Sequence, residues 1–222
     1  MIGVLSHPAA ENRSGTSLAG HRIAVLIESD FYEHEISYYR YRFPEEGADV
    51  HFLTRLWGQP SLTFTGHEYK APLICTESFE NMDDDTLRGY SAIIVPSAMV
   101  SDRLRYSEDL TRLAPATDLM CRAFAEPGIV KGIICHGLWL MSRVPELVRG
   151  RRLVCHPNLY GDALNMGADY VDADVVVDGD LVTARSGAQA GAFARTIIEQ
   201  LTARTPAGRM PEPVGAGRGG RS

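Results

Sequence analysis

The stretch Val130-Lys-Gly-Ile-Ile-Cys-His-Gly137 indicates an α/β fold, because an apolar strand in it runs directly into the start of a helix. Its β-branched residues are typical of a parallel strand covered on both faces. Cys135 stands at the junction, where a sharp strand-to-helix turn holds a side chain exposed and directs backbone N–H groups at it. A side chain at position 137 would collide with the neighbouring strand, which explains the glycine. Two interpretations of Cys135 therefore stay open at this point: a nucleophile at an elbow, or an inert cysteine of the core.

Apolar runs alternate with helical patterns on both sides of this stretch. Further strands are predicted at residues 23–27, 49–53, 90–96 and 152–155. Helices are predicted at residues 33–46, 108–126 with an interruption at Pro115, and 190–203. Residues 55–80 are turn-rich and predict an extended hairpin or loop, and Asp178-Gly-Asp180 predicts a tight turn between two short strands. This alternation predicts an α/β sandwich with a mostly parallel central sheet.

In such folds the site lies beyond the carboxyl ends of the strands. The segments that follow the three apolar strands are Glu28-Ser29-Asp30, Pro96-Ser97-Ala98 and Cys135-His136. We therefore expect these three segments to meet at one edge of the sheet.

The composition limits the classes of protein to which the chain can belong. It has 222 residues, of which 45% are hydrophobic, so it can build one large core. Its 22 Lys and Arg against 28 Asp and Glu give a net charge of −6, which argues against a nucleic-acid binder. No apolar run approaches the ~20 residues of a membrane span. The four cysteines form no C-x-x-C pair. We expect a cytoplasmic protein with one domain at residues 21–204, an N-terminal tail at 1–20 and a disordered tail at 205–222.

The elbow Ile133-Ile-Cys-His-Gly137 resembles that of the ThiJ/PfpI family, and the similarity extends through residues 22–203 in order. The other similar segments are Asp30–Ile36 with Glu45–Val50, Pro96–Arg105, Arg149–Arg151 and Val171–Arg185. The resemblance implies a class I glutamine amidotransferase-like fold, which is a flavodoxin-like three-layer sandwich with a mostly parallel central sheet.

The resemblance also implies catalytic roles for four residues. Cys135 would be the nucleophile, and His136 would act as acid or base. Glu35 matches a carboxyl group that reaches from the first helix to hydrogen-bond the cysteine; beside a thiolate it must be largely protonated. Asp102 matches the carboxylate that orients the histidine from a neighbouring subunit. Because Cys135 and His136 are adjacent in sequence, we expect their side chains to diverge, which leaves direct base action on the thiol open.

The oxyanion hole implied by the resemblance consists of the His136 N–H and one N–H of the Ser97-Ala98 turn. Several positions depart from the family pattern. Ser97-Ala98 replaces Gly-Gly, Leu138 replaces Pro, Tyr32 replaces Glu, and Gly187-Ala-Gln189 replaces Pro-x-Asp. We interpret these changes as adaptation to a different, less polar substrate. The expected substrate-binding and oxyanion-binding residues are Ser97, Ala98, Gly137, Tyr32 and Leu138.

The remaining motifs indicate no cofactor. The histidines show no metal-binding spacing, and no Gly-rich phosphate loop is present, so we expect neither metal nor cofactor. Tyr38, Tyr39 and Tyr41 alternate with Arg40 and Arg42. At this net charge they favour a dimer interface or a pocket wall over a nucleic-acid surface.

Three functions stay open. The first is a cysteine-nucleophile hydrolase or hydro-lyase that acts on a small electrophile, which could be a carbonyl compound, isonitrile, amide or thioester, through a covalent Cys135 adduct. The second is a non-catalytic redox sensor or stress-response binding protein that uses Cys135. The third is a PfpI-type intracellular peptidase. We expect a small-molecule substrate and a homodimer or higher homo-oligomer, with no nucleic-acid or membrane partner.

Overall fold

The computed structural model describes residues 17–204 and has a seven-stranded sheet at its centre. The strand order is β10-β11-β7-β6-β1-β2-β5, and β10 is the one antiparallel member. The strands are β1 (Arg22–Leu26), β2 (Asp49–Thr54), β5 (Glu77–Ser78), β6 (Ala92–Val95), β7 (Val130–Ile134), β10 (Val175–Asp178) and β11 (Leu181–Ala184). The predicted mostly parallel sheet is therefore confirmed, as is the tight turn, in which Gly179 has a φ of 61°.

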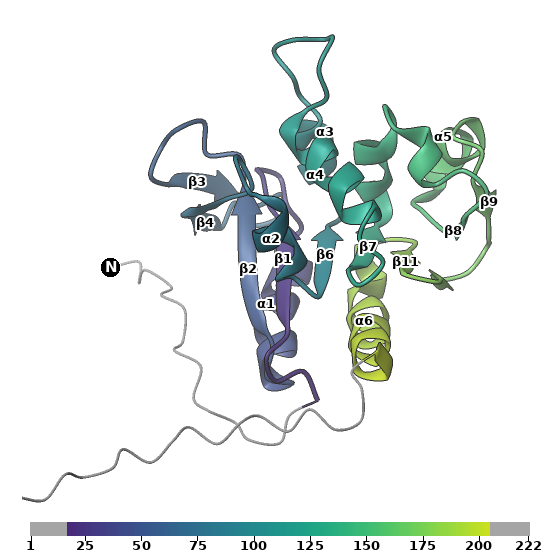
Figure 1. The fold of residues 1–222 in the computed structure, drawn as a ribbon, viewed down its shortest axis with the longest axis horizontal. Coiled ribbons are helices and arrows are strands. Elements are labelled where there is room, and N and C mark those ends of the chain that lie inside the picture. Colours follow the sequence, from purple (N-terminus) through teal and green to yellow (C-terminus); the bar gives the residue numbers. More distant parts are fainter. Residues whose placement is uncertain (1–16, 205–222) are drawn as a thin grey trace, which may run out of the picture.

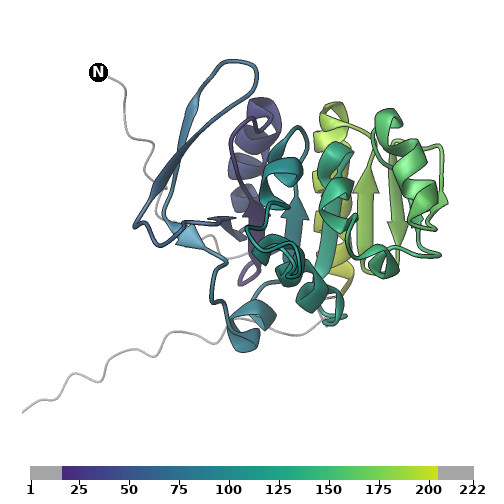
Figure 2. The ribbon, with the colours of Figure 1, turned by 90° about the horizontal axis from the view of Figure 1, so that it is seen from above.

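Helices flank this sheet, which gives the expected flavodoxin-like sandwich (Figure 2). Helix α1 (Glu33–Glu45) packs beside α6 (Ala190–Arg204), and α6 contacts β7 and β11. Gly132 in β7 permits this packing, because a Cβ there would lie 2.9 Å from the Phe193 ring. The other helices are α2 (Asp84–Arg88), α3 (Val100–Leu104), α4 (Pro115–Phe124) and α5 (Tyr160–Asn165).

Two small sheets lie at opposite sides of the molecule (Figure 1). One is the hairpin of β3 (Leu62–Thr65) and β4 (Pro72–Cys75), which forms within the turn-rich segment as predicted. The other pairs β8 (Arg152–Leu153) with β9 (Asp169–Tyr170). The strand predicted at residues 152–155 is therefore shorter than expected and does not join the central sheet.

The structure corrects two further boundaries. Helix α4 begins at Pro115 instead of being interrupted there, because proline lacks an N–H and fits the first turn of a helix. Leu18 was assigned to the N-terminal tail, but its side chain is fully buried and its N–H donates to the Glu46 carbonyl. The rest of that tail and residues 205–222 lie outside the described residues. Within residues 17–204, no helix is long and apolar enough to cross a membrane.

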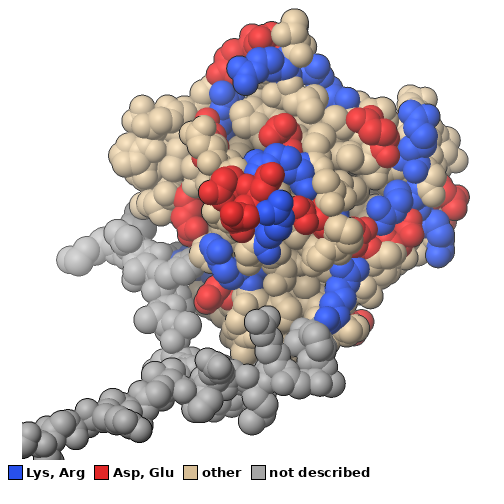
Figure 3. Space-filling view, viewed as in Figure 1, with Lys and Arg blue, Asp and Glu red and all other residues tan. Residues whose placement is uncertain are grey.

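The charges on the face shown in Figure 3 are mixed in sign, with acidic and basic side chains interspersed. Ion pairs between acidic and basic side chains occur in the described residues, such as those of Arg55 with Glu80 and Glu108. This face therefore offers no extended basic surface of the kind that attracts a polyanion.

Candidate active site

Cys135 occupies the expected elbow at the carboxyl end of β7. The strand ends at Ile134, Cys135 has a φ of 59°, and the 3-10 helix η1 (Cys135–Met141) follows at once. Gly137 fits the tight turn as predicted, because a Cβ there would lie 2.7 Å from the Val95 carbonyl oxygen in the neighbouring strand. The strand, the turn and the glycine together place the sulfur at the edge of the sheet.

Strained backbone gathers at this edge. Asp30, Ala98 and Cys135 have φ values of 59°, 61° and 59°, and they follow β1, β6 and β7. Residues other than glycine rarely adopt this conformation, which costs of order 1–3 kcal/mol each and concentrates at functional sites. Each of the three segments expected to form the site therefore contains one such residue; the other three described residues of this kind are Trp57, Lys70 and Asn81.

His136 lies beside the thiol, contrary to the expected divergence of the two side chains. Its Nδ1 is 3.2 Å from the Cys135 sulfur. In a regular strand adjacent side chains point to opposite faces, but the positive φ of Cys135 breaks that alternation. The Nδ1 atom of His136 therefore lies within hydrogen-bonding distance of the thiol.

The sulfur is buried, with 7% of the Cys135 residue surface exposed. Burial raises the pKa of the thiol; the backbone N–H groups of His136, Ala98 and Gly187 lower it, and the nearby Glu35 charge raises it further. The N–H groups of His136 and Ala98 are the two that were expected to form the oxyanion hole. A base beside the thiol is therefore needed to form the nucleophilic thiolate at neutral pH.

Glu35 is completely buried, and its hydrogen-bond partner is Ser97. Both carboxyl oxygens accept from the Ser97 N–H, at 3.3 and 3.1 Å, and Oε2 also pairs with the Ser97 hydroxyl. Burial raises the pKa of Glu35 from 4.5 to about 7, against the lowering effect of these hydrogen bonds. Within the described residues, the expected Glu35–Cys135 hydrogen bond does not form. Ser97, which stands in place of a glycine, binds the carboxyl group instead.

Two other aromatic rings contact the ring of His136. Trp139 contacts it edge-on, with ring centroids 4.9 Å apart, and His156 packs against it at 4.5 Å. Burial and the positive charge that His156 can carry lower the pKa of His136. The Ser101 hydroxyl donates to the His136 carbonyl oxygen at 2.6 Å, which fixes the backbone of the elbow. At neutral pH His136 is thus suited to accept a proton.

Asp102 does not reach His136 within this chain. It lies on α3 and pairs with Arg105 at 2.6 Å. The Arg105 guanidinium in turn lies over the Trp139 ring, 5.2 Å from its centroid. The role of Asp102 toward the histidine of a neighbouring subunit stays a prediction.

The two remaining predicted residues occupy different surroundings. Tyr32 lies at the site, because its ring covers Gly187, where a Cβ would come within 2.5 Å of the ring. Leu138 is 1% exposed and belongs to the hydrophobic core. Its apolar character is explained by burial, and its role in substrate binding stays a prediction.

Comparisons with known proteins agree with this geometry. Residues 21–200 match the DJ-1/PfpI family. The chain belongs to the DJ-1/PfpI family. A deglycase of Pyrococcus abyssi is 30% identical over 181 residues, which cover 81% of this chain and 99% of that protein. Protein/nucleic acid deglycase 2 of Escherichia coli is 29% identical over 183 residues, covering 82% and 98%. The structure of Drosophila melanogaster DJ-1beta superposes with a TM-score of 0.69 at 19% identity, over 82% of this chain and 91% of that one.

Two residues of this DJ-1/PfpI site were not recognised from the sequence. His156 is one of the histidines without metal-binding spacing, which were interpreted as loop or core residues, and only the tertiary fold brings its ring against His136. Gly187 was noted as a departure from Pro-x-Asp, but not as a residue whose backbone N–H lowers the pKa of the thiol. The signal was available at Gly187, because proline has no N–H and glycine does.

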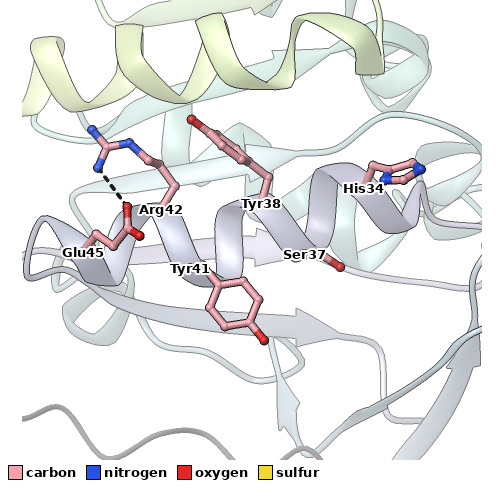
Figure 4. Close-up of a pocket in the computed structure, with 6 residues that line it drawn as sticks. All are labelled: His34, Ser37, Tyr38, Tyr41, Arg42 and Glu45. Carbon is pink, nitrogen blue, oxygen red and sulfur yellow. Dashed lines mark ion pairs between the residues drawn. The ribbon is translucent and has the colours of Figure 1, made fainter.

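A hollow on the outer side of α1 is separate from this site. It is lined by His34, Ser37, Tyr38, Tyr41, Arg42 and Glu45 (Figure 4). Tyr41 is exposed, whereas Tyr39 points into the core and is fully buried. The aromatic cluster of α1 is thus divided between the core and the surface, and its assignment to a dimer interface stays a prediction. Within residues 17–204, no three His, Cys, Asp or Glu side chains gather to hold a metal ion.

Proposed function

We propose that this protein is a cysteine-dependent enzyme that converts a small electrophilic carbonyl compound through a covalent Cys135 adduct. The observation that carries the proposal is the 3.2 Å contact between the Cys135 sulfur and His136 Nδ1 at a strained elbow. The deglycase names of the two relatives support carbonyl chemistry over the isonitrile, amide and thioester alternatives.

The first step is proton transfer followed by attack. His136 Nδ1 takes the thiol proton, and the sulfur forms a bond to the carbonyl carbon while the carbonyl π electrons move to oxygen. In this proposal the backbone N–H groups of Ala98 and His136, which lower the pKa of the thiol, stabilise this oxyanion. The protonated His136 then returns its proton to the oxygen, which leaves a neutral hemithioacetal.

Methylglyoxal is a suitable probe for the later steps. Once neutral again, His136 can remove the C1 proton of the hemithioacetal, which gives an enediolate. A proton returned to C2, with transfer of the C1 hydroxyl proton to the C2 oxygen, yields the thioester of lactate. Water then attacks the thioester, and the Cys135 thiol leaves with its proton restored. The sum is methylglyoxal plus water to lactate, with no external oxidant or reductant.

The test is the formation of lactate from methylglyoxal by the full chain and by variants. We expect Cys135→Ser to abolish turnover and His136→Ala to lower it by about 10²–10⁴-fold, as expected for loss of a general base. Cys121→Ser is the matched control, because Cys121 lies on α4 and is only partly buried. This variant should retain activity.

Two other outcomes would contradict the proposal. Oxidation of Cys135 to a sulfinic acid by dilute peroxide, with no turnover of any carbonyl probe, would favour the redox sensor. Cleavage of casein that depends on Cys135, without lactate formation, would favour the peptidase. Peptide mass spectrometry and gel electrophoresis of the same samples distinguish the two.

A further inference from the structure

The tip of the β3–β4 hairpin, residues 66–71, is fixed to the start of helix α1. The Glu33 carboxylate accepts hydrogen bonds from the backbone N–H groups of Glu68, at 2.9 Å, and of Tyr69, at 2.8 Å. Glu33 is only 6% exposed, and a Cβ at Gly66 would lie 2.1 Å from its carboxyl carbon. The tip can therefore come this close to α1 because position 66 is a glycine.

The hairpin tip lies at the edge of the sheet that carries Cys135. The N–H of Asp30 donates to the Thr65 carbonyl at 2.7 Å, at the end of β3. The carbonyl of Asp30 accepts from the Met99 N–H at 3.2 Å, next to the turn that contains Ala98. In Figure 1 the hairpin lies beside the carboxyl end of β2. The hairpin is therefore joined to a turn of the candidate active site through one residue.

Three aromatic rings connect the hairpin tip with the catalytic pocket. The Tyr69 hydroxyl is 2.8 Å from His34 Nε2, and the two rings meet edge-on with centroids 5.3 Å apart. The His34 ring meets that of Tyr32 edge-on at 5.4 Å. The Tyr32 ring reaches the pocket, because a Cβ at Gly187 would lie 2.5 Å from Tyr32 Cδ1 and 3.1 Å from the Ser97 hydroxyl. The three rings thus form one aromatic row from the pocket to the tip.

We propose that this aromatic row of Tyr32, His34 and Tyr69 is the wall of the substrate entrance and selects carbonyl compounds that carry an aromatic group. The inference rests on the proposed function, because it names the substrate class of the same Cys135 site. Tyr69 is 66% exposed and His34 is also exposed, so both rings keep surface for a ligand. A substrate ring can pack edge-on or offset against such rings, whereas the methyl group of methylglyoxal is too short to follow the row.

The seat of the hairpin tip does not require the tyrosine ring. Glu33 accepts the backbone N–H of residue 69, and this bond can form whichever side chain stands there. A ring that is largely exposed on a fixed backbone contributes little to the core but offers a preorganised surface to a ligand. Replacing Tyr69 should therefore change ligand selection while the chain still folds.

Two substitutions at position 69 and one on the adjoining strand form a matched set. Tyr69→Ala removes the ring, whereas Tyr69→Phe keeps the ring and removes only the hydroxyl contact with His34. Ile74→Ala trims a side chain of β4 that is 56% exposed and pairs in register with Thr63, away from the tip. Thermal unfolding of the three variants verifies that each is folded.

The experiment compares two alkylating agents at Cys135 that share one reactive group. Iodoacetanilide differs from iodoacetamide by a phenyl ring, and glutathione calibrates their intrinsic rates. Peptide mapping gives the ratio of the two rate constants at Cys135. We expect Tyr69→Ala to lower this ratio about threefold to tenfold, as for the loss of one aromatic contact, and Tyr69→Phe and Ile74→Ala to keep most of it. Equal ratios in the parent and in Tyr69→Ala would overturn the inference.

Turnover of two α-oxoaldehydes separates this inference from the proposed function. The kcat/KM for conversion of phenylglyoxal to mandelate, divided by that for methylglyoxal to lactate, should also fall in Tyr69→Ala. A lower alkylation ratio in that variant, with neither compound converted by the parent, would overturn the proposed function and leave the aromatic wall standing. Turnover of both compounds with unchanged ratios would overturn the wall and leave the proposed function standing.

A further measurement needs no substitution. In the parent chain alkylated at Cys135 with iodoacetanilide, the anilide ring protons should show NOEs to the ring protons of Tyr32 and of Tyr69. NOEs from the anilide ring to other side chains alone would contradict the proposal, even if Tyr69→Ala failed to fold.

Discussion

The two ends of β7 bury ionisable groups in opposite ways. At the amino end, Lys131 is fully buried and donates to the carbonyl oxygens of Glu126 and Ile129, each at 3.0 Å, and to the Asp180 carboxylate. Arg151 also pairs with Asp180, at 2.9 Å. Burial lowers the pKa of Lys131, and Asp180 opposes that effect. At this end the buried charge of Lys131 is paired, and its ammonium group donates to three acceptors.

At the carboxyl end, Glu35 and Cys135 are buried without an opposite charge in contact. No ion pair among the described residues involves Glu35, and its partner Ser97 is neutral. Burial therefore dominates, and it raises the pKa values of both Glu35 and Cys135. The comparison teaches that the buried charges at the amino end of the strand are paired. At the carboxyl end burial is uncompensated and brings the pKa of Glu35 to about 7, so that this group can change protonation near neutral pH.

The largest expected effect tests the amino end of β7. Lys131→Met removes one partner of a buried pair and leaves Asp180 with less compensation, so we expect a loss of about 4 kcal/mol of unfolding free energy. Turnover per folded molecule should not change. Urea unfolding and methylglyoxal kinetics provide the two readouts.

The double variant Lys131→Met/Asp180→Leu is the control, because removing both charges should recover much of that stability. If Lys131→Met has the same free energy of unfolding as the parent but a lower turnover, the assignment of a structural role to the amino end of β7 is wrong.

The next effect concerns the pH dependence of stability. Because the folded pKa of Glu35, about 7, lies above its ordinary value of 4.5, the folded state binds the extra proton, and stability falls as pH rises through this window. Glu35→Gln removes the ionisation while its amide can still bond Ser97. The variant should gain on the order of 3 kcal/mol relative to the parent between pH 4 and pH 8.

The measurement is urea unfolding of both proteins across that range of pH. If the free energies of unfolding of the two proteins change in parallel with pH, the pKa of Glu35 is the same in the folded and unfolded states. That result would contradict the raised pKa of the buried Glu35. Glu45→Gln, on the exposed side of the same helix, is a matched control that should leave the curve nearly unchanged.

A smaller effect is expected from the elbow glycine. Gly137→Ala places a Cβ 2.7 Å from the Val95 carbonyl oxygen, which is backbone and cannot move aside cheaply. We expect a loss of about 1–3 kcal/mol from overpacking, together with lower turnover because the elbow shifts. Gly128→Ala, where a Cβ meets nothing within 4 Å, should be tolerated. Equal behaviour of the two variants in thermal unfolding would contradict a tight elbow.

The smallest effect sharpens the role of the second histidine. His156→Phe keeps a ring against His136 but removes a charge that lowers the pKa of His136. The pKa of His136 should rise slightly, by a fraction of a unit, because burial is the larger cause. NMR titration of the His136 ring gives the value. A fall in that pKa would show that His156 acts in another way.

The sequence allowed the scaffold to be predicted because its signals are local. Apolar runs mark the strands, Asp178-Gly-Asp180 marks the turn, and Cys-His-Gly after a buried strand marks the elbow. The helix predicted at residues 108–126 is longer than the observed one, because composition alone does not locate its start. The helix begins at Pro115. The contacts of the site depend instead on tertiary structure. Glu35 meets Ser97, and His156 meets His136, only when distant segments pack together.

The contact between His136 and Cys135 was missed for a local reason. Its geometry depends on the positive φ of Cys135, a conformation that a non-glycine residue seldom adopts and that sequence patterns therefore do not indicate. The same holds for Ala98, whose N–H points at the sulfur.

The relative reactivity of the four cysteines tests the central claim most directly. Burial raises the pKa of Cys75 to about 11 and of Cys155 to about 12, whereas the sulfur of Cys135 lies beside the Nδ1 atom of His136. Iodoacetamide labelling at pH 7.5, followed by peptide mapping, gives the four rates in one sample. The account predicts that Cys135 reacts fastest, that methylglyoxal protects it, and that His136→Ala slows it. Faster labelling of Cys121 on α4, with Cys135 inert and indifferent to His136, would contradict the account.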